Sequence, residues 1–298
     1  CGVAGAEPFP EYLAELERRS ALWPAAAALY RALARRADPR ADAPWARAIV
    51  VAVRRYGRYR LPQALLGHIG RNYLADRRMP AGPDHDLPQK LTARLRALGL
   101  RVRRGGVPDR AAAARAGVVA IGRNGFAYSP RWGSWINLET WRVDADLPPG
   151  RPLPCPCPDG CRACLEACPT RALERPYVMR PDRCVAYLTY GAPEPIAPEL
   201  WERMGAWIYG CDDCQTACPL NRGRWEPLDP APWLEAAAEA LTPAALAAMN
   251  LDTYRRLVHP LFGYIPDTPV GLVRWRRNAA RALKARRQTV TPPDLTLP

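Results

Sequence analysis

The chain has 298 residues, of which 48% are hydrophobic and 24% charged, a composition that suits one large globular domain or roughly two to three small ones. No apolar run approaches the roughly 20 residues that a membrane span needs, and no basic flank leads into an apolar stretch as in a secretory leader, so the sequence predicts a cytoplasmic protein with no membrane partner. The formal net charge is +14, and all but two of the 43 basic residues are arginine. A GC-rich genome explains arginine in place of lysine, yet a basic surface attracts anionic partners such as RNA whatever its origin.

The first part of the chain alternates helical and strand-like patterns. Val3 and Ala4 end a possible first strand, and Pro10–Arg19 has apolar residues at helical spacing. The apolar run Ala48–Val53 predicts a buried strand. Pro88–Leu98 predicts a helix, because its leucines recur on one helical face and Gly99 follows as a plausible terminator.

The pattern continues with four more elements up to residue 150. A strand is expected at Leu100–Val102, followed by an alanine-rich helix over Arg110–Ala116 that Gly117 closes. Two further strands, Phe126–Tyr128 and Trp135–Val143, are expected on either side of a turn. Residues 1–150 therefore predict an α/β domain.

Six prolines between Leu147 and Pro158 mark a stiff linker and a domain boundary. We expect a cysteine-rich module over 151–222 and a helical region over 223–298. That last region has helical patterns at Trp233–Leu241, Pro243–Met249 and Val270–Ala285. The expected fold class is α+β: an N-terminal α/β domain, a ferredoxin-like module and a helical C-terminal tail.

Nine of the ten cysteines fall between residues 155 and 218, in two related motifs. The first motif is Cys157-x3-Cys161-x2-Cys164-x3-Cys168-Pro, and the second is Cys211-x2-Cys214-x3-Cys218-Pro, with Cys184 between them. Ferredoxins with two [4Fe–4S] clusters use C-x2-C-x2-C-x3-C-P, and the cysteine before proline binds the other cluster. The repeat therefore predicts two such clusters.

The same crossing rule assigns four thiolates to each cluster. Cluster one would take Cys157, Cys161, Cys164 and Cys218, and cluster two would take Cys168, Cys184, Cys211 and Cys214. The first motif departs from the usual spacing by one residue, so Cys155 is a possible rival for Cys157.

Zinc sites, disulfides and structural free thiols also occur in cysteine-rich chains, but each fits this pattern poorly. Zinc sites with four cysteine ligands use paired C-x2-C knuckles, which the doubled x2-then-x3 spacing before proline does not match. A disulfide framework suits small secreted domains, and structural free cysteines would not cluster in this way. Iron–sulfur chemistry is the favoured interpretation.

Three cysteine-bearing segments, Cys161–Leu173, Arg183–Thr189 and Ile208–Asn221, resemble the epoxyqueuosine reductases, which are cobalamin-dependent enzymes with two clusters related to reductive dehalogenases. The similarity continues through shorter matches upstream and downstream, at Ala114–Gly117, Gly122–Asn124, Gly133–Trp135 and Gly271–Asn278. It also implies that Cys1–Ala4 is the family's first strand and that a preceding helix is missing, so we expect a truncated chain.

The resemblance implies a function and a set of cofactor contacts. Electrons would enter through the clusters and reduce a cobalamin in the N-terminal domain, with a ferredoxin or flavodoxin as donor, tRNA as a possible substrate and a monomer as the working unit. By position in the family, the candidate cobalamin contacts are Arg110, Asn124, Phe126, Ser134 and Asn137. For Phe126 and Ser134, strand packing and a turn hydroxyl are the plainer alternatives.

One departure concerns the family's catalytic aspartate, because Arg103 occupies its position here. A guanidinium cannot donate a proton near neutral pH, so Tyr73 or Tyr128 is an alternative donor, although a tyrosine more often packs than catalyses. Asp109 is expected to cap the following helix. A ferredoxin-like electron-transfer protein, a divergent reductase of another substrate and an RNA-binding relative without redox turnover therefore remain alternatives.

A histidine and the C-terminal helix give weaker signals. His68 could be a lower cobalt ligand, although a satisfied histidine is the plainer interpretation. The C-terminal helix is basic and could be either a solvated face or a phosphate-binding strip for tRNA; its arginines are Arg274, Arg276, Arg277, Arg281, Arg286 and Arg287.

Overall fold

A four-stranded antiparallel sheet organises the N-terminal half of the computed structural model, which describes residues 1–76, 78–191, 195–262 and 269–288. The strands lie in the order β1 (Gly2–Gly5), β2 (Ala48–Arg55), β7 (Ile136–Val143) and β4 (Val102–Arg104). β2 and β7 pair over their full length, with Val51 opposite Thr140. The strands expected near residues 3, 50, 101 and 139 are thus present.

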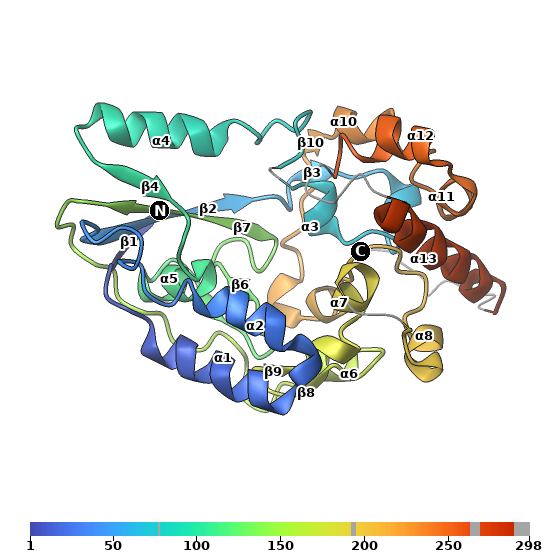
Figure 1. Cartoon of the computed structure of the whole chain (residues 1–298), viewed down its shortest axis with the longest axis horizontal. Helices are drawn as coiled ribbons and strands as arrows, with labels where there is room; N and C mark the ends of the chain where they lie inside the picture. Colours follow the sequence, from blue (N-terminus) through green and yellow to red (C-terminus); the bar gives the residue numbers. More distant parts are fainter. Residues whose placement is uncertain (77, 192–194, 263–268, 289–298) are drawn as a thin grey trace.

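Helices cover both faces of this sheet (Figure 1). On one face lie α5 (Asp109–Arg115) and the start of α1 (Pro10–Leu22), and α2 (Ala27–Ala34) packs on α1. On the other face lies α4 (Leu87–Ala97), where Leu95 contacts the cluster around Trp141. β2 alternates between these two cores, as expected for a strand with a helix on each side.

One expectation for this domain needs correction. The strand predicted at Phe126–Tyr128 is only β6 (Ala127–Tyr128), and it pairs with β5 (Ala120–Ile121), whereas β7 pairs with β2 and β4. The leucine face of α4 is only partly buried, because Leu91 is 41% exposed.

The cysteine module consists of short elements between loops. One-turn helices α6 (Ala163–Glu166) and α9 (Asp213–Thr216) follow the two cysteine loops, and the longer α7 (Val185–Tyr190) begins directly after Cys184. The module also contains the hairpin strands β8 (Leu173–Arg175) and β9 (Val178–Met179), helix α8 (Pro198–Arg203), and 3-10 turns at Pro181–Arg183 and Pro219–Asn221. Cys164, Cys168 and Cys214 share one small packed group, so the two halves of the repeat meet.

The C-terminal region contains short helices and one long helix: α10 (Pro232–Glu235), α11 (Pro243–Ala248), α12 (Leu251–Thr253), a π-helical turn over Tyr254–Val258, and α13 (Pro269–Gln288). The predicted helix at Trp233–Leu241 is shorter than expected, because turns replace it after Glu235. α13 lies beside α7 (Figure 1).

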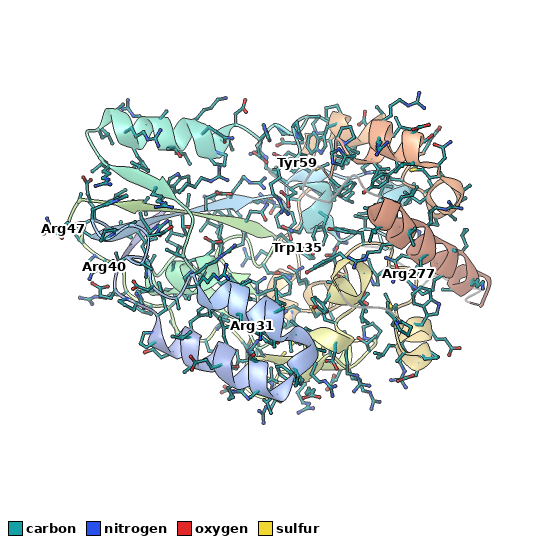
Figure 2. The ribbon with its side chains drawn as sticks, viewed as in Figure 1. Arg31, Arg40, Arg47, Tyr59, Trp135 and Arg277 are labelled. Carbon is teal, nitrogen blue, oxygen red and sulfur yellow. The ribbon has the colours of Figure 1, made fainter. Side chains whose placement is uncertain are left out.

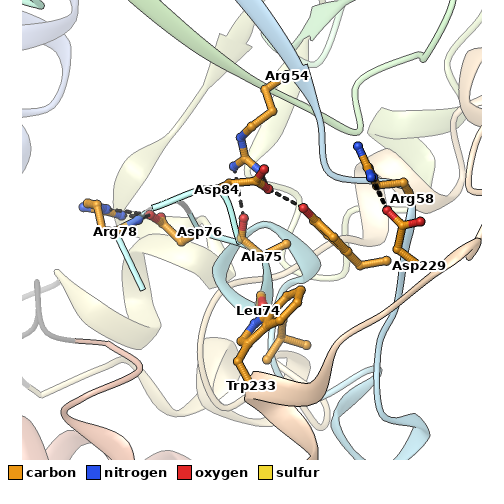
Figure 3. Close-up of polar contacts among 10 residues, drawn as sticks. Arg54, Arg58, Leu74, Ala75, Asp76, Arg78, Asp84, Asp229 and Trp233 are labelled. Carbon is orange, nitrogen blue, oxygen red and sulfur yellow. Dashed lines mark hydrogen bonds and ion pairs between the residues drawn. The ribbon is translucent and has the colours of Figure 1, made fainter. Parts of the chain in front are cut away.

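This region shares the largest apolar core with residues 56–79, which include α3 (Arg71–Leu74). β10 (Asp229–Pro230) pairs in parallel with β3 (Tyr59–Arg60), and Tyr59 packs edge-on against Trp233. Figure 3 shows the polar contacts of this junction: Asp84 binds Arg54 and Tyr59, and Trp233 donates to the carbonyl of Leu74. The C-terminal helices are therefore anchored to the N-terminal half through shared packing and hydrogen bonds.

None of the helices within the described ranges combines the length and the hydropathy that spanning a membrane requires.

Candidate functional site

Four thiols line one cavity at the boundary between the N-terminal domain and the cysteine module. Cys157, Cys161 and Cys164 come from the first loop, and Cys218 comes from the second. Burial, together with the neighbouring Cys218 and Cys157, raises the pKa of the Cys164 thiol to about 11. The cysteine before the second proline thus reaches the first loop, which is the arrangement that the crossing rule predicts.

The other four cysteines of the repeat form a second group. Burial raises the pKa of Cys214 well above its usual value, and Cys184 and Cys168 are its nearest thiol neighbours electrostatically. Burial likewise raises the pKa of Cys184, with a further contribution from Cys168. Cys211 interacts with Cys214, and burial raises its pKa too. As free thiols these groups resist ionisation, so a bound cation would have to stabilise the thiolates.

The first group surrounds a hollow instead of converging on a point. Among the described residues, no three histidine, cysteine, aspartate or glutamate side chains lie close enough together to hold a single metal ion. A cubane carries its iron atoms at separate corners and needs thiolates arranged around it, whereas zinc draws four ligands to within about 2.3 Å of one centre. Four thiols around one hollow are a donor set that fits a [4Fe–4S] cluster.

Backbone amides point at both sulfur groups. The amide of Arg123 donates to Cys157 Sγ at 3.3 Å, and the amide of Ala172 donates to Cys168 Sγ at 3.2 Å. Hydrogen bonds to cluster sulfurs stabilise negative charge and tune the reduction potential. The guanidinium of Arg123 also donates to the Cys161 carbonyl at 2.7 Å, which holds the first loop against the N-terminal domain.

Cys155 lies outside the cavity that Cys157 lines. Its exposed sulfur is 3.0 Å from the hydroxyl of Tyr177, and the hydrogen bond from that hydroxyl lowers the pKa of Cys155. Tyr177 has a left-handed backbone (φ 65°), and its amide bonds to the Arg123 carbonyl at 2.7 Å. This geometry favours Cys157 over Cys155 as a lining residue.

Two of the five candidate cobalamin contacts are buried and already engaged. Asn124 donates to the Tyr128 hydroxyl at 2.9 Å and to the Cys214 carbonyl at 3.3 Å, and it lines the cavity of the first thiol group. Ser134 donates to Gln215 at 2.8 Å and accepts from Asn221 at 2.8 Å. Both residues join the N-terminal domain to the cysteine module, which is the plainer role for the Ser134 hydroxyl.

The other three candidates are more accessible. Arg110 is exposed, and its guanidinium lies 5.0 Å from the ring centroid of the half-buried Phe126 and donates to the Gly125 carbonyl at 3.3 Å. Asn137 is half-buried in β7, opposite Arg54 of β2. Arg110 and Phe126 form a cationic and aromatic pair at the start of α5.

Arg103 is engaged in an ion pair, which is not the arrangement expected of a catalytic acid. It forms an ion pair with Asp42 at 2.8 Å, and Asp42 also binds the buried Arg142. Asp109 does not cap α5 as predicted. It is the first helical residue, after Pro108, and its carboxylate accepts a 2.7 Å hydrogen bond from Thr140.

The two alternative tyrosines lie in different surroundings. Tyr128 is buried beside Cys218, and burial raises its pKa above the ordinary range. Tyr73 is hydrogen-bonded to Tyr190 and packs edge-on against Tyr209, with ring centroids 4.8 Å apart. Tyr190 is 39% exposed, so the Tyr73–Tyr190 pair reaches solvent.

Sequence reasoning missed a buried polar site between the second cysteine loop and α3. Asp212 accepts a 2.9 Å hydrogen bond from the Arg71 amide, and burial raises its pKa to about 6. The guanidinium of Arg71 lies 5.0 Å from the rings of both Trp135 and Trp225. Figure 2 marks Trp135 just before β7. No local motif links Arg71 to these rings, because they come from three separate regions.

His68 and the basic helix have structural partners. His68 is buried, and its Nδ1 lies 2.8 Å from the Ala206 carbonyl. Arg281 belongs neither to a solvated face nor to a phosphate-binding strip, because it is 4% exposed and binds backbone carbonyls inside the protein. Arg276 is exposed, whereas Arg274 is half-buried and donates to the Tyr190 carbonyl. The side chains of Arg286 and Arg287 lie outside the described residues.

Comparisons with known proteins agree with this geometry. Residues 157–221 match the 4Fe–4S double cluster binding domain, so this segment contains such a domain. The chain is 34% identical to a Bacillus subtilis epoxyqueuosine reductase over 194 residues, which cover 64% of the chain and 48% of that protein. It therefore spans about half the length of this relative.

Solved structures show the same likeness in three dimensions. An epoxyqueuosine reductase from Streptococcus thermophilus superposes with a TM-score of 0.76 at 25% identity, covering 96% of this chain and 77% of the other. An epoxyqueuosine reductase solved with an epoxyqueuosine-modified tRNA-Tyr stem loop gives 0.75 at 25% identity, covering 95% and 76%. The mixed helix and sheet fold is thus that of these reductases.

Proposed function

We propose, since the chain resembles epoxyqueuosine reductases in both sequence and fold, that it is an iron–sulfur, cobalamin-dependent oxidoreductase that acts on tRNA. The observation that carries this proposal is the meeting of Cys218 with Cys157, Cys161 and Cys164 around one cavity. In a protein with two [4Fe–4S] clusters, each cluster takes one of its cysteine ligands from the other cysteine motif.

The ligand sets follow from the two thiol groups. Cys157, Cys161, Cys164 and Cys218 would hold cluster one, and Cys168, Cys184, Cys211 and Cys214 would hold cluster two. When bound, the clusters carry single electrons and cobalamin supplies low-valent cobalt chemistry. The chain's own contribution is to keep the thiolates in place, to donate the amides of Arg123 and Ala172 to their sulfurs, and to shield them from water.

For cobalamin, the N-terminal domain offers one exposed cation and one aromatic face. Arg110 and Phe126 would contact the cofactor directly, and Asn137 would donate from β7. Asn124 and Ser134 would support the cofactor site indirectly, because their hydrogen bonds hold residues 122–134 against the cysteine module. These two buried side chains already have hydrogen-bond partners in the protein, so direct contact with cobalamin fits them less well than it fits Arg110 and Phe126.

A tRNA substrate agrees with the charge of the chain. The net charge of +14 favours binding to phosphates, and arginines such as Arg31, Arg40 and Arg47 are exposed on the N-terminal domain (Figure 2). A similar structure holds a tRNA stem loop. The electron donor would be a ferredoxin or flavodoxin, and the working unit a monomer.

The proton donor is where this chain differs from the family pattern. Arg103 is paired with Asp42 and cannot donate a proton near neutral pH. Of the two tyrosines, Tyr73 fits better, because it is bonded to the partly exposed Tyr190, whereas Tyr128 is buried against Cys218. A divergent substrate is the second candidate, and Arg103 is the observation that favours it.

Anaerobic reconstitution with iron, sulfide and cobalamin tests the proposal. We expect about eight iron atoms per chain, a cob(II)alamin spectrum that changes on binding, and reduction of epoxyqueuosine in a tRNA stem loop. Clusters without corrin binding would indicate a ferredoxin-like electron carrier. Corrin binding without turnover of epoxyqueuosine would indicate a divergent substrate. Zinc in place of iron would refute the proposal.

A further inference from the structure

One face of α13 carries polar side chains into the interior of the protein. Asn278 is 1% exposed and Arg281 is 4% exposed. An arginine is almost never buried so completely unless something compensates its charge. Arg277, on the same face, is half-buried and lies beside α7 (Figure 2).

These side chains hold the segment that follows Cys184. Asn278 Nδ2 donates to the Thr189 carbonyl at 3.0 Å, and Arg277 donates to the Leu188 carbonyl at 3.4 Å. Both carbonyls lie in the last turn of α7, whose first turn starts at Cys184. α13 therefore fixes the helix that carries one thiol of the second group.

The same side chains also hold the segment that precedes Cys211. Asn278 Nδ2 donates to the Ile208 carbonyl at 2.8 Å, and Arg281 donates to the carbonyls of Gly205 and Trp207. Trp207 in turn donates its indole N–H to Asp213 at 3.1 Å, between Cys211 and Cys214. One helix thus binds both chain segments that must converge on cluster two.

The two segments held by α13 are also hydrogen-bonded to each other. The amide of Gly210 donates to the Thr189 hydroxyl at 2.9 Å, which links the Cys211 loop to α7. Cys211 also packs against the apolar group around Trp207, Leu188 and Met204. Arg281 thus binds the carbonyl of Trp207, and Trp207 belongs to the apolar group against which Cys211 packs.

The charge of Arg281 has no carboxylate partner. Within the described ranges it forms no ion pair, and its Nε has no hydrogen-bond partner. Burial and, to a lesser extent, the nearby Arg277 lower its pKa to about 10. A buried cation is costly unless an anion lies near it, and four thiolates give a [4Fe–4S] cluster a net negative charge.

We propose that Arg281 is a positioning residue for cluster two, which supplies the buried positive charge that raises the reduction potential of that cluster, while Asn278 fixes the two loops that bind it. The inference rests on the ligand sets proposed above. A nearby cation stabilises the reduced cluster, which is the more negative form, so it shifts the potential upward.

The test is a redox titration of the anaerobically reconstituted full chain, followed by EPR. In Arg281→Met we expect full iron content and one couple shifted to a more negative potential, with the other couple unchanged. Arg281→Lys retains the charge, so its potential should return toward the wild-type value. Arg276→Met is the matched control, because Arg276 lies on the same helix but is exposed and donates to the Ala247 carbonyl.

Several outcomes separate this inference from the proposed function. Wild-type protein without iron would refute the proposed function and the inference together. Wild-type protein with two clusters, and with neither couple shifted in Arg281→Met, would refute the inference alone. If Arg281→Met does not fold, Arg277→Met decides: the same couple must move in the same direction by a smaller amount, and unmoved couples overturn the inference.

Discussion

The two thiol groups are supported by different parts of the chain. The N-terminal domain supports the first group, where the Arg123 amide bonds Cys157 and Asn124 and Tyr128 line the cavity. The C-terminal helix supports the second group, where Arg277, Asn278 and Arg281 bind the carbonyls around it. A repeat that is nearly symmetric in sequence thus becomes asymmetric through its surroundings, and those surroundings can give two similar clusters different potentials.

The largest expected effect comes from removing one ligand from each group. Cys164→Ala should abolish cluster one and lower iron from about eight to about four atoms per chain, because three thiolates hold a cubane poorly. Cys214→Ala should do the same for cluster two. Iron analysis with EPR would show two different residual signals. Identical residual signals, or unchanged iron, would contradict the division into two sets.

A second test asks which thiol completes the first group. Cys157→Ser should lose cluster one, whereas Cys155→Ser should keep about eight iron atoms per chain, because Cys155 lies outside the cavity and contacts Tyr177. The two variants are matched controls, since they make the same substitution two positions apart. If only Cys155→Ser loses iron, the rival assignment is correct.

A third test weakens the link between the N-terminal domain and the cysteine module. Asn221→Ala removes the hydrogen bonds to Ser134 and to the Gln215 carbonyl, and leaves buried groups without partners. We expect the free energy of unfolding to fall by about 1–3 kcal/mol per unsatisfied group, measured by denaturant titration of reconstituted protein. Arg276→Met, on the exposed face of α13, should change it little. If Asn221→Ala lost only the EPR signal of cluster two, this would contradict the assignment of the N-terminal domain to the support of the first thiol group.

The smallest effect concerns the outer support of the first group. Hydrogen bonds from Arg18 and Arg19 lower the pKa of Glu15 to about 2, and Arg19 also donates to the Tyr177 carbonyl at 2.8 Å. The folded protein holds this carboxylate ionised more strongly than the unfolded chain, so its stabilisation is present above the ordinary pKa of 4.5 and is lost as pH falls toward about 2.

The pair is partly exposed, so we expect Glu15→Gln to cost at most about 1 kcal/mol near neutral pH. The difference in unfolding free energy between wild type and Glu15→Gln should shrink as the pH is lowered from about 6 to about 3, across the ordinary carboxylate pKa. A difference that stays constant over this range would show that the carboxylate charge plays no part.

Of the features of the site, the grouping of the cysteines was the most predictable from the sequence. Motif spacing alone brought Cys218 to the first loop, because short loops before proline constrain where each thiol can point. The strands of the sheet were also predictable, since alternating or continuous apolar runs are local signals. Strand pairing was less predictable, because no periodic pattern in the sequence indicates that β6 pairs with β5.

The hydrogen-bond partners of three polar residues could not be predicted from the sequence, for one physical reason. Ser134, Asn124 and Arg281 have their partners in distant segments, at Gln215, Cys214 and Trp207 respectively. A polar residue in a sequence gives no sign of whether its partner will be solvent, ligand or backbone. Arg281 in particular lies among several arginines in the sequence, and only the packed helix distinguishes it from the exposed Arg276.

The position of α13 also sets an order of maturation during synthesis. Among the described residues, all those that line the first cavity precede residue 222, so a growing polypeptide contains them before the last helices have been translated. The second half must wait, because the carbonyls around Cys184 and Cys211 have no clamp until residues 277–281 emerge. Iron delivery to a nascent chain would therefore fill the two halves one after the other, in the direction of translation.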